Sequence, residues 1–138
     1  NDKIENNLSG CFFRNENRQK AIDHIAALCS KTDTIYIYDR YFSKHEAANN
    51  LQILNKIFPK KKLTIVYHPN HINDIDITTL QTYCSDWILQ KQFLNSHHDR
   101  YLILDNKMEV ILTSGFSYLS NTDKEFTYVI RPVSQERF

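Results

Sequence analysis

The stretch His98-Asp99-Arg100-Tyr101-Leu102-Ile103-Leu104-Asp105 is the most informative part of the sequence, because a strand-forming run carries an imidazole, a guanidinium and a carboxylate at H-x-R-x4-D spacing. We predict a β-strand over 98–104. Alternate residues of a strand share a face, so His98 and Arg100 should point the same way. An imidazole can attack phosphorus or move protons near neutral pH, and a guanidinium can neutralise phosphate oxygens. One site could therefore hold a nucleophile beside a cation, a combination suited to a phosphodiester.

Hydrophobic periodicity predicts alternating helices and strands around this stretch. Helical spacing predicts a helix over 16–30 with Asn15 as N-cap, a second over 46–58 and a short third over 77–84. β-Branched and aromatic runs predict the strands. The predicted strands cover 34–38, 63–67, 87–93, 98–104, 108–113 and 125–131. The order βαβαβ followed by three strands predicts an α/β fold, a mixed β-sheet flanked by helices.

Polar residues follow two of these strands. Asp39 and Tyr41 come after the strand over 34–38, at the carboxyl end where sites of α/β proteins usually lie. Ser114 and Ser117 follow the strand over 108–113, and the hydroxyl and backbone N–H groups of such a loop can donate to phosphate. We predict that both serines bind phosphate, and that Asp39, Tyr41 and Asp99 support the site.

Each candidate also has a purely structural interpretation. His98 is a nucleophile, a phosphate ligand or a hydrogen-bonded strand residue. Arg100 binds phosphate through two N–H groups, or pairs with Asp99 or Asp39 at the strand ends. Asp105 orients the site, or makes local hydrogen bonds in an Asp-Asn-Lys hairpin turn. The sequence leaves these alternatives open.

Composition narrows the class of protein. The 138 residues include 17 Lys+Arg and 16 Asp+Glu, so any phosphate binding must come from local clustering of charge. Three scattered cysteines without C-x-x-C spacing fit a reducing compartment, and no run resembles a signal peptide or a membrane span. We expect one soluble, cytoplasmic domain over 1–138. Because the sequence opens on Asn1, we also expect a longer parent protein with other domains.

The histidines raise the alternative of a metal site. His68, His71, His97, His98 and Asp99 could assemble into a ligand set after folding. However, the His-x-x-His spacing straddles a proline, lacks cysteine partners and matches no established ligand signature. We therefore expect neither a metal nor a cofactor.

The motif resembles the phospholipase D superfamily signature, H-x-K-x4-D followed by G-S-x-N. Arg100 stands at the family's lysine, Asp105 matches the aspartate, and the loop over 113–117 replaces G-S-x-N only loosely. Active members cleave phosphodiesters without a metal through a covalent phosphohistidine, and each site uses two motifs. The resemblance implies a phospholipase-D-like fold with His98, Arg100 and Asp105 as catalytic residues. With one motif present, it also implies a homodimer.

An ordered set of short motifs resembles the phospholipase-D-like C-terminal domain of MIT-domain proteins, over roughly residues 30–133. That domain has D-P-Y, H-D-R and L-R-P in sequence. The matching residues here are Asp39-Arg40-Tyr41, His98-Asp99-Arg100 and Ile130-Arg131-Pro132. Those relatives are regarded as non-catalytic domains that associate with membranes and dimerise. Bacterial phospholipase-D-like domains with H-D-R-(F/Y) followed by aspartate are also similar.

These observations leave three functions. The first is a domain that binds phosphate-bearing ligands, either nucleic acid or an acidic phospholipid headgroup, or a protein partner, with little or no turnover. The second is a homodimeric, metal-independent phosphodiesterase, a nuclease with His98 as nucleophile. The third is a protein-interaction module using an edge strand or the surface over 87–93. Arg100 and the missing asparagine favour the first, whereas Asp105 favours the second.

Overall fold

A computed structural model describes residues 8–94 and 100–137. Its strands are β1 (Leu8–Phe12), β2 (Thr34–Tyr38), β3 (Leu63–Tyr67), β4 (Trp87–Lys91), β5 (Arg100–Leu104), β6 (Met108–Leu112) and β7 (Phe126–Pro132). Its helices are α2 (Gln19–Cys29), α3 (Ala47–Ile57) and α4 (Asp74–Tyr83), with 3-10 turns η1 (Phe116–Leu119) and η2 (Gln135–Arg137).

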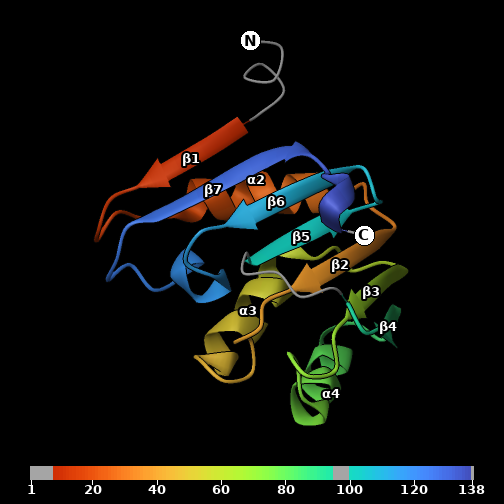
Figure 1. Ribbon diagram of the computed structural model, residues 1–138. Helices are drawn as coiled ribbons and strands as arrows, with labels where there is room; N and C mark the ends of the chain where they lie inside the picture. Colours follow the sequence, from red (N-terminus) through yellow and green to blue (C-terminus); the bar gives the residue numbers. More distant parts are fainter. Residues whose placement is uncertain (1–7, 95–99, 138) are drawn as a thin grey trace.

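The described strands form one mixed sheet in the order β1-β7-β6-β5-β2-β3-β4 (Figure 1). β2, β3 and β4 run parallel and are connected through α3 and α4. β5, β6, β7 and β1 form the antiparallel half of the sheet, which joins the parallel half where β5 pairs antiparallel with β2. The predicted α/β class with a mixed sheet and flanking helices is confirmed.

The three α-helices pack against one face of the sheet. Ile25 of α2, Leu54 of α3 and Leu80 of α4 are buried in a single apolar core. Ile37 of β2 and Leu102 of β5 reach the same core from the sheet. Burial of this apolar face supplies most of the free energy that holds the helices on the sheet.

The opposite face carries a smaller cluster. Tyr38 and Tyr101 stack there with ring centroids 5.0 Å apart. The Arg137 guanidinium lies 4.2 Å from the centre of the Tyr101 ring. Fully buried Glu109 accepts from Arg131 at 3.0 Å and from Arg137 at 3.1 Å, which holds η2 against the sheet.

Two helices begin three residues away from their predicted starts. The helix predicted over 16–30 begins only at Gln19, because Asn15 has a φ of 65° and donates its backbone N–H to Thr122. Asn15 therefore forms a turn and is not the N-cap. The helix predicted over 77–84 begins earlier, at Asp74, because the Asn73 side chain accepts from the backbone N–H of Asp76 at 2.8 Å.

The sequence did not predict β1. This strand pairs with β7, with Gly10 opposite Tyr128, and a Cβ on Gly10 would collide with the Tyr128 ring. Only a glycine lets this edge strand approach so closely. Residues 98 and 99, predicted to begin the strand that is β5, lie outside the described residues.

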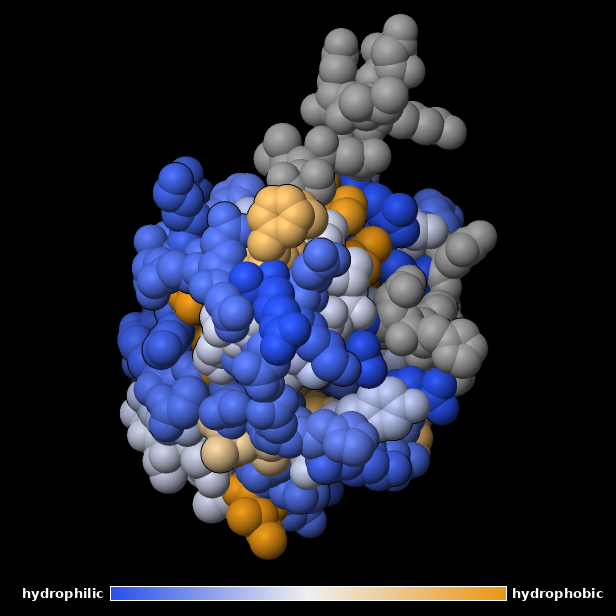
Figure 2. All heavy atoms as spheres, turned by 90° about the vertical axis from the view of Figure 1, so that its left-hand side faces the viewer, coloured by the Kyte–Doolittle hydropathy of each residue, from blue (hydrophilic) through white to orange (hydrophobic). Residues whose placement is uncertain are grey.

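The edge where β2 and β6 end is the left-hand side of Figure 1 and faces the viewer in Figure 2. Most of the described surface on that side is hydrophilic, and hydrophobic residues are scattered over it.

None of the described helices has the length and apolar character to cross a membrane.

Candidate phosphate-binding site

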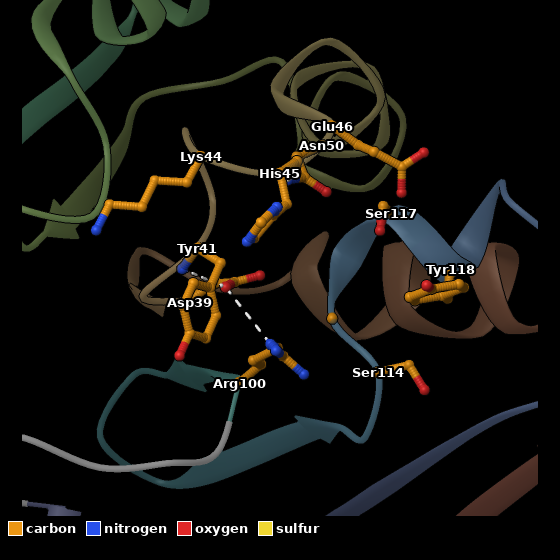
Figure 3. A pocket seen from close by; sticks show the side chains of 11 residues that line it. Asp39, Tyr41, Lys44, His45, Glu46, Asn50, Arg100, Ser114, Ser117 and Tyr118 are labelled. Carbon is orange, nitrogen blue, oxygen red and sulfur yellow. Dashed lines mark hydrogen bonds and ion pairs between the residues drawn. The ribbon is translucent and has the colours of Figure 1, made fainter.

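The polar residues converge on a pocket of about 390 Å³ at the edge where β2 ends and β5 begins (Figure 3). Tyr38 pairs with Tyr101, so Asp39 after β2 comes beside Arg100 at the start of β5. Arg100 also pairs with Leu112, which brings the loop after β6 to the same edge. The lining is completed by the start of α3. The residues around the pocket are Asp39, Tyr41, Lys44, His45, Glu46, Asn50, Arg100, Ser114, Gly115, Ser117 and Tyr118.

The Arg100 side chain is held in this pocket by contacts with Asp39 and Tyr41. Its Nε lies 3.6 Å from Oδ1 of buried Asp39, and its guanidinium lies 5.3 Å from the centre of the Tyr41 ring. The Arg100 side chain remains 29% exposed. A guanidinium has five N–H donors, so Arg100 can meet Asp39 and still donate to an oxyanion in the pocket.

The Asp39 carboxylate contacts both the Arg100 guanidinium and the backbone of Tyr41. Its Oδ1 accepts the backbone N–H of Tyr41 at 2.9 Å. Burial raises the pKa of Asp39, although the Tyr41 hydrogen bond and the Arg100 charge oppose that shift. A desolvated carboxylate of this kind stabilises a nearby guanidinium and orients it.

The loop after β6 approaches Arg100 closely because Gly115 lacks a side chain. Gly115 has a φ of 94°, and a Cβ there would lie 3.0 Å from Cδ of Arg100 and 3.3 Å from Oδ2 of Asp39. On either side of this close approach, Ser114 and Ser117 line the pocket. The predicted association of the two serines with Arg100 is therefore present in the described structure.

Asp105 lies at the other end of β5, away from this pocket. It has a φ of 52° in the β5–β6 turn, and its Oδ1 accepts the backbone N–H groups of Asp33 at 3.0 Å and Thr34 at 2.9 Å. Asp105 thus lies in the predicted turn, but its side chain bonds to the start of β2 and not locally within the turn. His98 and Asp99, by contrast, lie outside the described residues.

Sequence reasoning missed the contribution of the segment that leads into α3. Lys44, His45 and Glu46 all line the pocket. The His45 ring lies 5.4 Å from that of Tyr41, and buried Asn50 donates to the carbonyl of His45 at 3.0 Å. The available signal was the run of polar residues beyond the carboxyl end of β2.

Two of the histidines considered for a metal site, His68 and His71, lie within the described residues, whereas His97 and His98 do not. The rings of His68 and His71 stack with centroids 4.3 Å apart. Over residues 8–94 and 100–137, no group of three or more His, Cys, Asp or Glu side chains is arranged to hold a metal ion.

Comparisons with known proteins indicate which fold this chain has. No protein-family model matches the sequence, and no curated protein matches it. Among solved structures, NucT from Helicobacter pylori aligns with a TM-score of 0.52 and 12% identity, over 90% of this chain and 84% of that one. The fold is phospholipase-D-like. At this identity the likeness concerns the fold alone.

Two further solved structures resemble this chain with lower TM-scores. Nuc from Salmonella typhimurium, described as a phospholipase D family member, has a TM-score of 0.44 and 12% identity over 90% of this chain and 82% of its own. TrmBL2, described as an archaeal chromatin protein, has a TM-score of 0.40 and 10% identity over 88% of this chain and 46% of its own.

Proposed function

We propose that this domain binds the phosphodiester group of a ligand in the Arg100 pocket, with little or no turnover. The observation that supports this proposal is the partly exposed Arg100 guanidinium, held by Asp39 and Tyr41 beside the glycine loop. A phosphate can accept from the guanidinium fork and from Ser114 or Ser117 at the same time. The near balance of charge over the whole chain makes such local donors decisive.

The electrostatics of the pocket favour binding over turnover. Asp39 offsets part of the Arg100 charge, and Glu46 places a second carboxylate in the lining. Phosphoryl transfer is accelerated by positive groups that stabilise the charge of the transition state. Two carboxylates reduce that stabilisation, while a ground-state phosphate can still form directed hydrogen bonds.

A homodimeric, metal-independent phosphodiesterase is the second candidate, favoured by the presence of the His45 imidazole in the pocket. In this proposal a His98 ring nitrogen attacks phosphorus, and the P–O bond to the leaving oxygen breaks. That oxygen takes a proton from a second imidazole, either His98 of the other copy or His45. Water then cleaves the P–N bond and restores the imidazole. Asp105 would support this chemistry through the turn that it stabilises.

A protein-interaction module is the third candidate. Ile88 on the edge strand β4 and Phe93 after it are 47% and 79% exposed, within the surface predicted from the sequence. Apolar side chains on an edge strand can recruit a partner by strand addition. This candidate requires neither Arg100 nor His98.

One experiment separates the three candidates. Wild type, Arg100→Gln, His98→Ala and the control Lys107→Gln are incubated in EDTA with labelled DNA, RNA and a simple phosphodiester, and the mass in solution is recorded. We expect binding by wild type and by the control, about ten-fold weaker binding by Arg100→Gln, and no cleavage. Lys107 is exposed in the β5–β6 turn, so its substitution removes one charge far from the pocket.

The alternative outcomes are equally specific. Unchanged affinity in Arg100→Gln would overturn the leading proposal. Cleavage by a dimer that disappears in His98→Ala would establish the phosphodiesterase. If wild type binds none of these ligands, the protein-interaction module gains support.

A further inference from the structure

A second pocket, of about 410 Å³, borders the Arg100 pocket. Arg40 follows β2 and His68 follows β3, and the parallel pairing of these strands brings both residues to one edge of the sheet. Tyr41 and Lys44 line both pockets. In Figure 3 the Lys44 side chain extends to the side opposite Ser117 and Tyr118. The two pockets therefore share one wall along the end of the sheet.

The second pocket is more cationic than the first. Arg40 and Lys44 line it, whereas no carboxylate of the described residues does. Neither cation forms an ion pair within the described part of the chain. In the Arg100 pocket, by contrast, the negative charge of Asp39 offsets the positive charge of the guanidinium. Two uncompensated cations in a concave surface attract an anion.

His68 adds a neutral donor to these charges. Its Nδ1 accepts the backbone N–H of Asn70 at 3.0 Å, which leaves the proton of the neutral ring on Nε2. Burial lowers the pKa of His68, which favours this neutral form. Stacking against His71 fixes the plane of the ring. An N–H with a fixed direction suits a phosphate oxygen.

We propose that the second pocket binds another phosphate of the same ligand, and that this ligand is a single-stranded nucleic acid. The inference rests on the proposed function, because the Arg100 pocket holds the first phosphodiester. In the second pocket, Arg40, Lys44 and Nε2–H of His68 donate to the phosphate oxygens. A chain of regularly spaced phosphates can occupy two adjoining pockets.

Exposed aromatic rings favour nucleic acid over a lipid headgroup. Tyr41 is 40% exposed and Phe93 is 79% exposed. The Phe93 ring packs edge-on to His68 with centroids 5.3 Å apart. Unpaired bases stack on such rings, so aromatic side chains along a cationic groove are typical of single-strand binding. A simple phospholipid carries one phosphodiester and would fill only one pocket.

The test compares ligands that carry one or several phosphodiesters. Fluorescence anisotropy measures binding of a labelled single-stranded DNA oligonucleotide across a salt series, and a dinucleoside monophosphate competes for the Arg100 pocket. The proteins are wild type, Arg40→Gln, His68→Phe, Arg100→Gln and the charge-matched control Lys107→Gln. His68→Phe keeps a ring against His71 and removes the N–H donor. Vesicles containing phosphatidylserine provide the lipid arm.

We expect Arg40→Gln to weaken oligonucleotide binding about five- to ten-fold and to reduce the salt slope by about 0.7, the value for one lost phosphate contact on a single strand. His68→Phe should weaken oligonucleotide binding by a smaller factor. Both variants should bind the dinucleoside monophosphate as wild type does. Arg100→Gln should weaken both ligands, and Lys107→Gln neither.

Different outcomes of this test would refute different parts of the proposal. If Arg40→Gln matches Lys107→Gln on the oligonucleotide while Arg100→Gln is impaired, the second pocket is refuted and the proposed function stands. If wild type binds neither probe, both proposals fall. Binding to vesicles but not to the oligonucleotide, with loss in Arg40→Gln, would assign the pocket to a lipid surface and overturn the nucleic-acid ligand.

Discussion

Gly115 is the single residue on which the geometry of the Arg100 pocket most depends. It has a φ of 94° and a ψ of 174°, a backbone conformation that is essentially restricted to glycine. The same residue leaves room for the side chains of Arg100 and Asp39. A Cβ at this position therefore acts in two ways, by straining the backbone and by displacing the cation.

We predict that Gly115→Ala lowers the free energy of unfolding by about 1–3 kcal/mol and weakens phosphodiester binding. Urea denaturation and the anisotropy assay measure the two effects. Lys107→Gln is the control, because Lys107 is exposed in the β5–β6 turn and does not line the pocket. If Gly115→Ala binds ligand like wild type, Arg100 does not need its observed position.

The protonation of His71, which lines the second pocket, makes the stability of the protein depend on pH. Burial, followed by the charges of His68, Arg40 and Lys44, lowers the pKa of His71 from 6.5 to about 4. The unfolded chain therefore takes up a proton at this residue at a higher pH than the folded protein does. Stability from neutral His71 is complete above pH 6.5 and is lost as the pH falls towards 4.

We predict that His71→Phe is less sensitive to acid than wild type. The free energy of unfolding of wild type should fall relative to the variant between pH 7 and pH 4, by at most about 3 kcal/mol. Denaturant unfolding at a series of pH values measures this difference, in which the titrations of other groups largely cancel. Parallel pH profiles for the two proteins would contradict the prediction.

At the scale of elements, the β5–β6 turn connects two strands and also contacts a third. Asp105 and Asn106 both have positive φ, at 52° and 56°, as a type I′ hairpin turn requires. Asp105 accepts the backbone N–H groups of Asp33 and Thr34, at the start of β2. The turn therefore helps to align β5 with β2, and this alignment places Arg100 beside Asp39.

We predict that Asp105→Ala lowers the free energy of unfolding by about 1–3 kcal/mol, because two backbone N–H groups lose their acceptor. Asp105→Asn should lose less than about 1 kcal/mol, because the amide oxygen can still accept and asparagine tolerates positive φ. Thermal or denaturant unfolding provides the comparison. Loss of ligand binding in a well-folded Asp105→Asn would indicate a direct role in the site.

Glu109 joins β6, β7 and η2 through one buried carboxylate. Burial opposes its ionisation, but hydrogen bonds from Arg137, the backbone N–H of Ser134 and Arg131 outweigh it and hold the pKa of Glu109 below its usual value. The stability from ionised Glu109 is therefore present above the unfolded pKa and is lost as the pH falls through the folded pKa.

We predict that Glu109→Gln lowers the free energy of unfolding by about 3 kcal/mol at pH 7, because the guanidinium groups lose their buried counter-charge. Glu125→Gln is a matched control at an exposed position. Equal denaturation midpoints for the two variants would show that the network contributes little.

At the scale of the whole molecule, residues that follow β2, β3 and β6 and the first residue of β5 line two adjoining pockets at one edge of the sheet. The binding proposal uses this one edge, whereas the phosphodiesterase candidate brings two copies of His98 together. We predict one oligonucleotide-binding site per chain, with an affinity that does not depend on protein concentration. Calorimetric stoichiometry and light scattering at two concentrations provide the check. Binding or cleavage confined to a dimer would favour the phosphodiesterase.

Local pattern in the sequence determined the order of helices α2 to α4 and strands β2 to β7. The strands over 34–38 and 63–67 were predicted with the boundaries that the structure has, because β-branched and aromatic periodicity reports burial within a short window. The same pattern placed Arg100 within a strand over 98–104 and Asp39 just after the strand over 34–38. The same reasoning led to the expectation that Ser114 and Ser117 belong with them.

Which distant residues meet depends on the tertiary structure. The pairing of Gly10 with Tyr128, the proximity of Arg40 to His68 and the contact of Asp105 with Thr34 each depend on strand order and register. Periodicity shows which way a side chain faces along its own element. It does not show which strand is the neighbour, because that choice is set by long-range burial and hydrogen bonding.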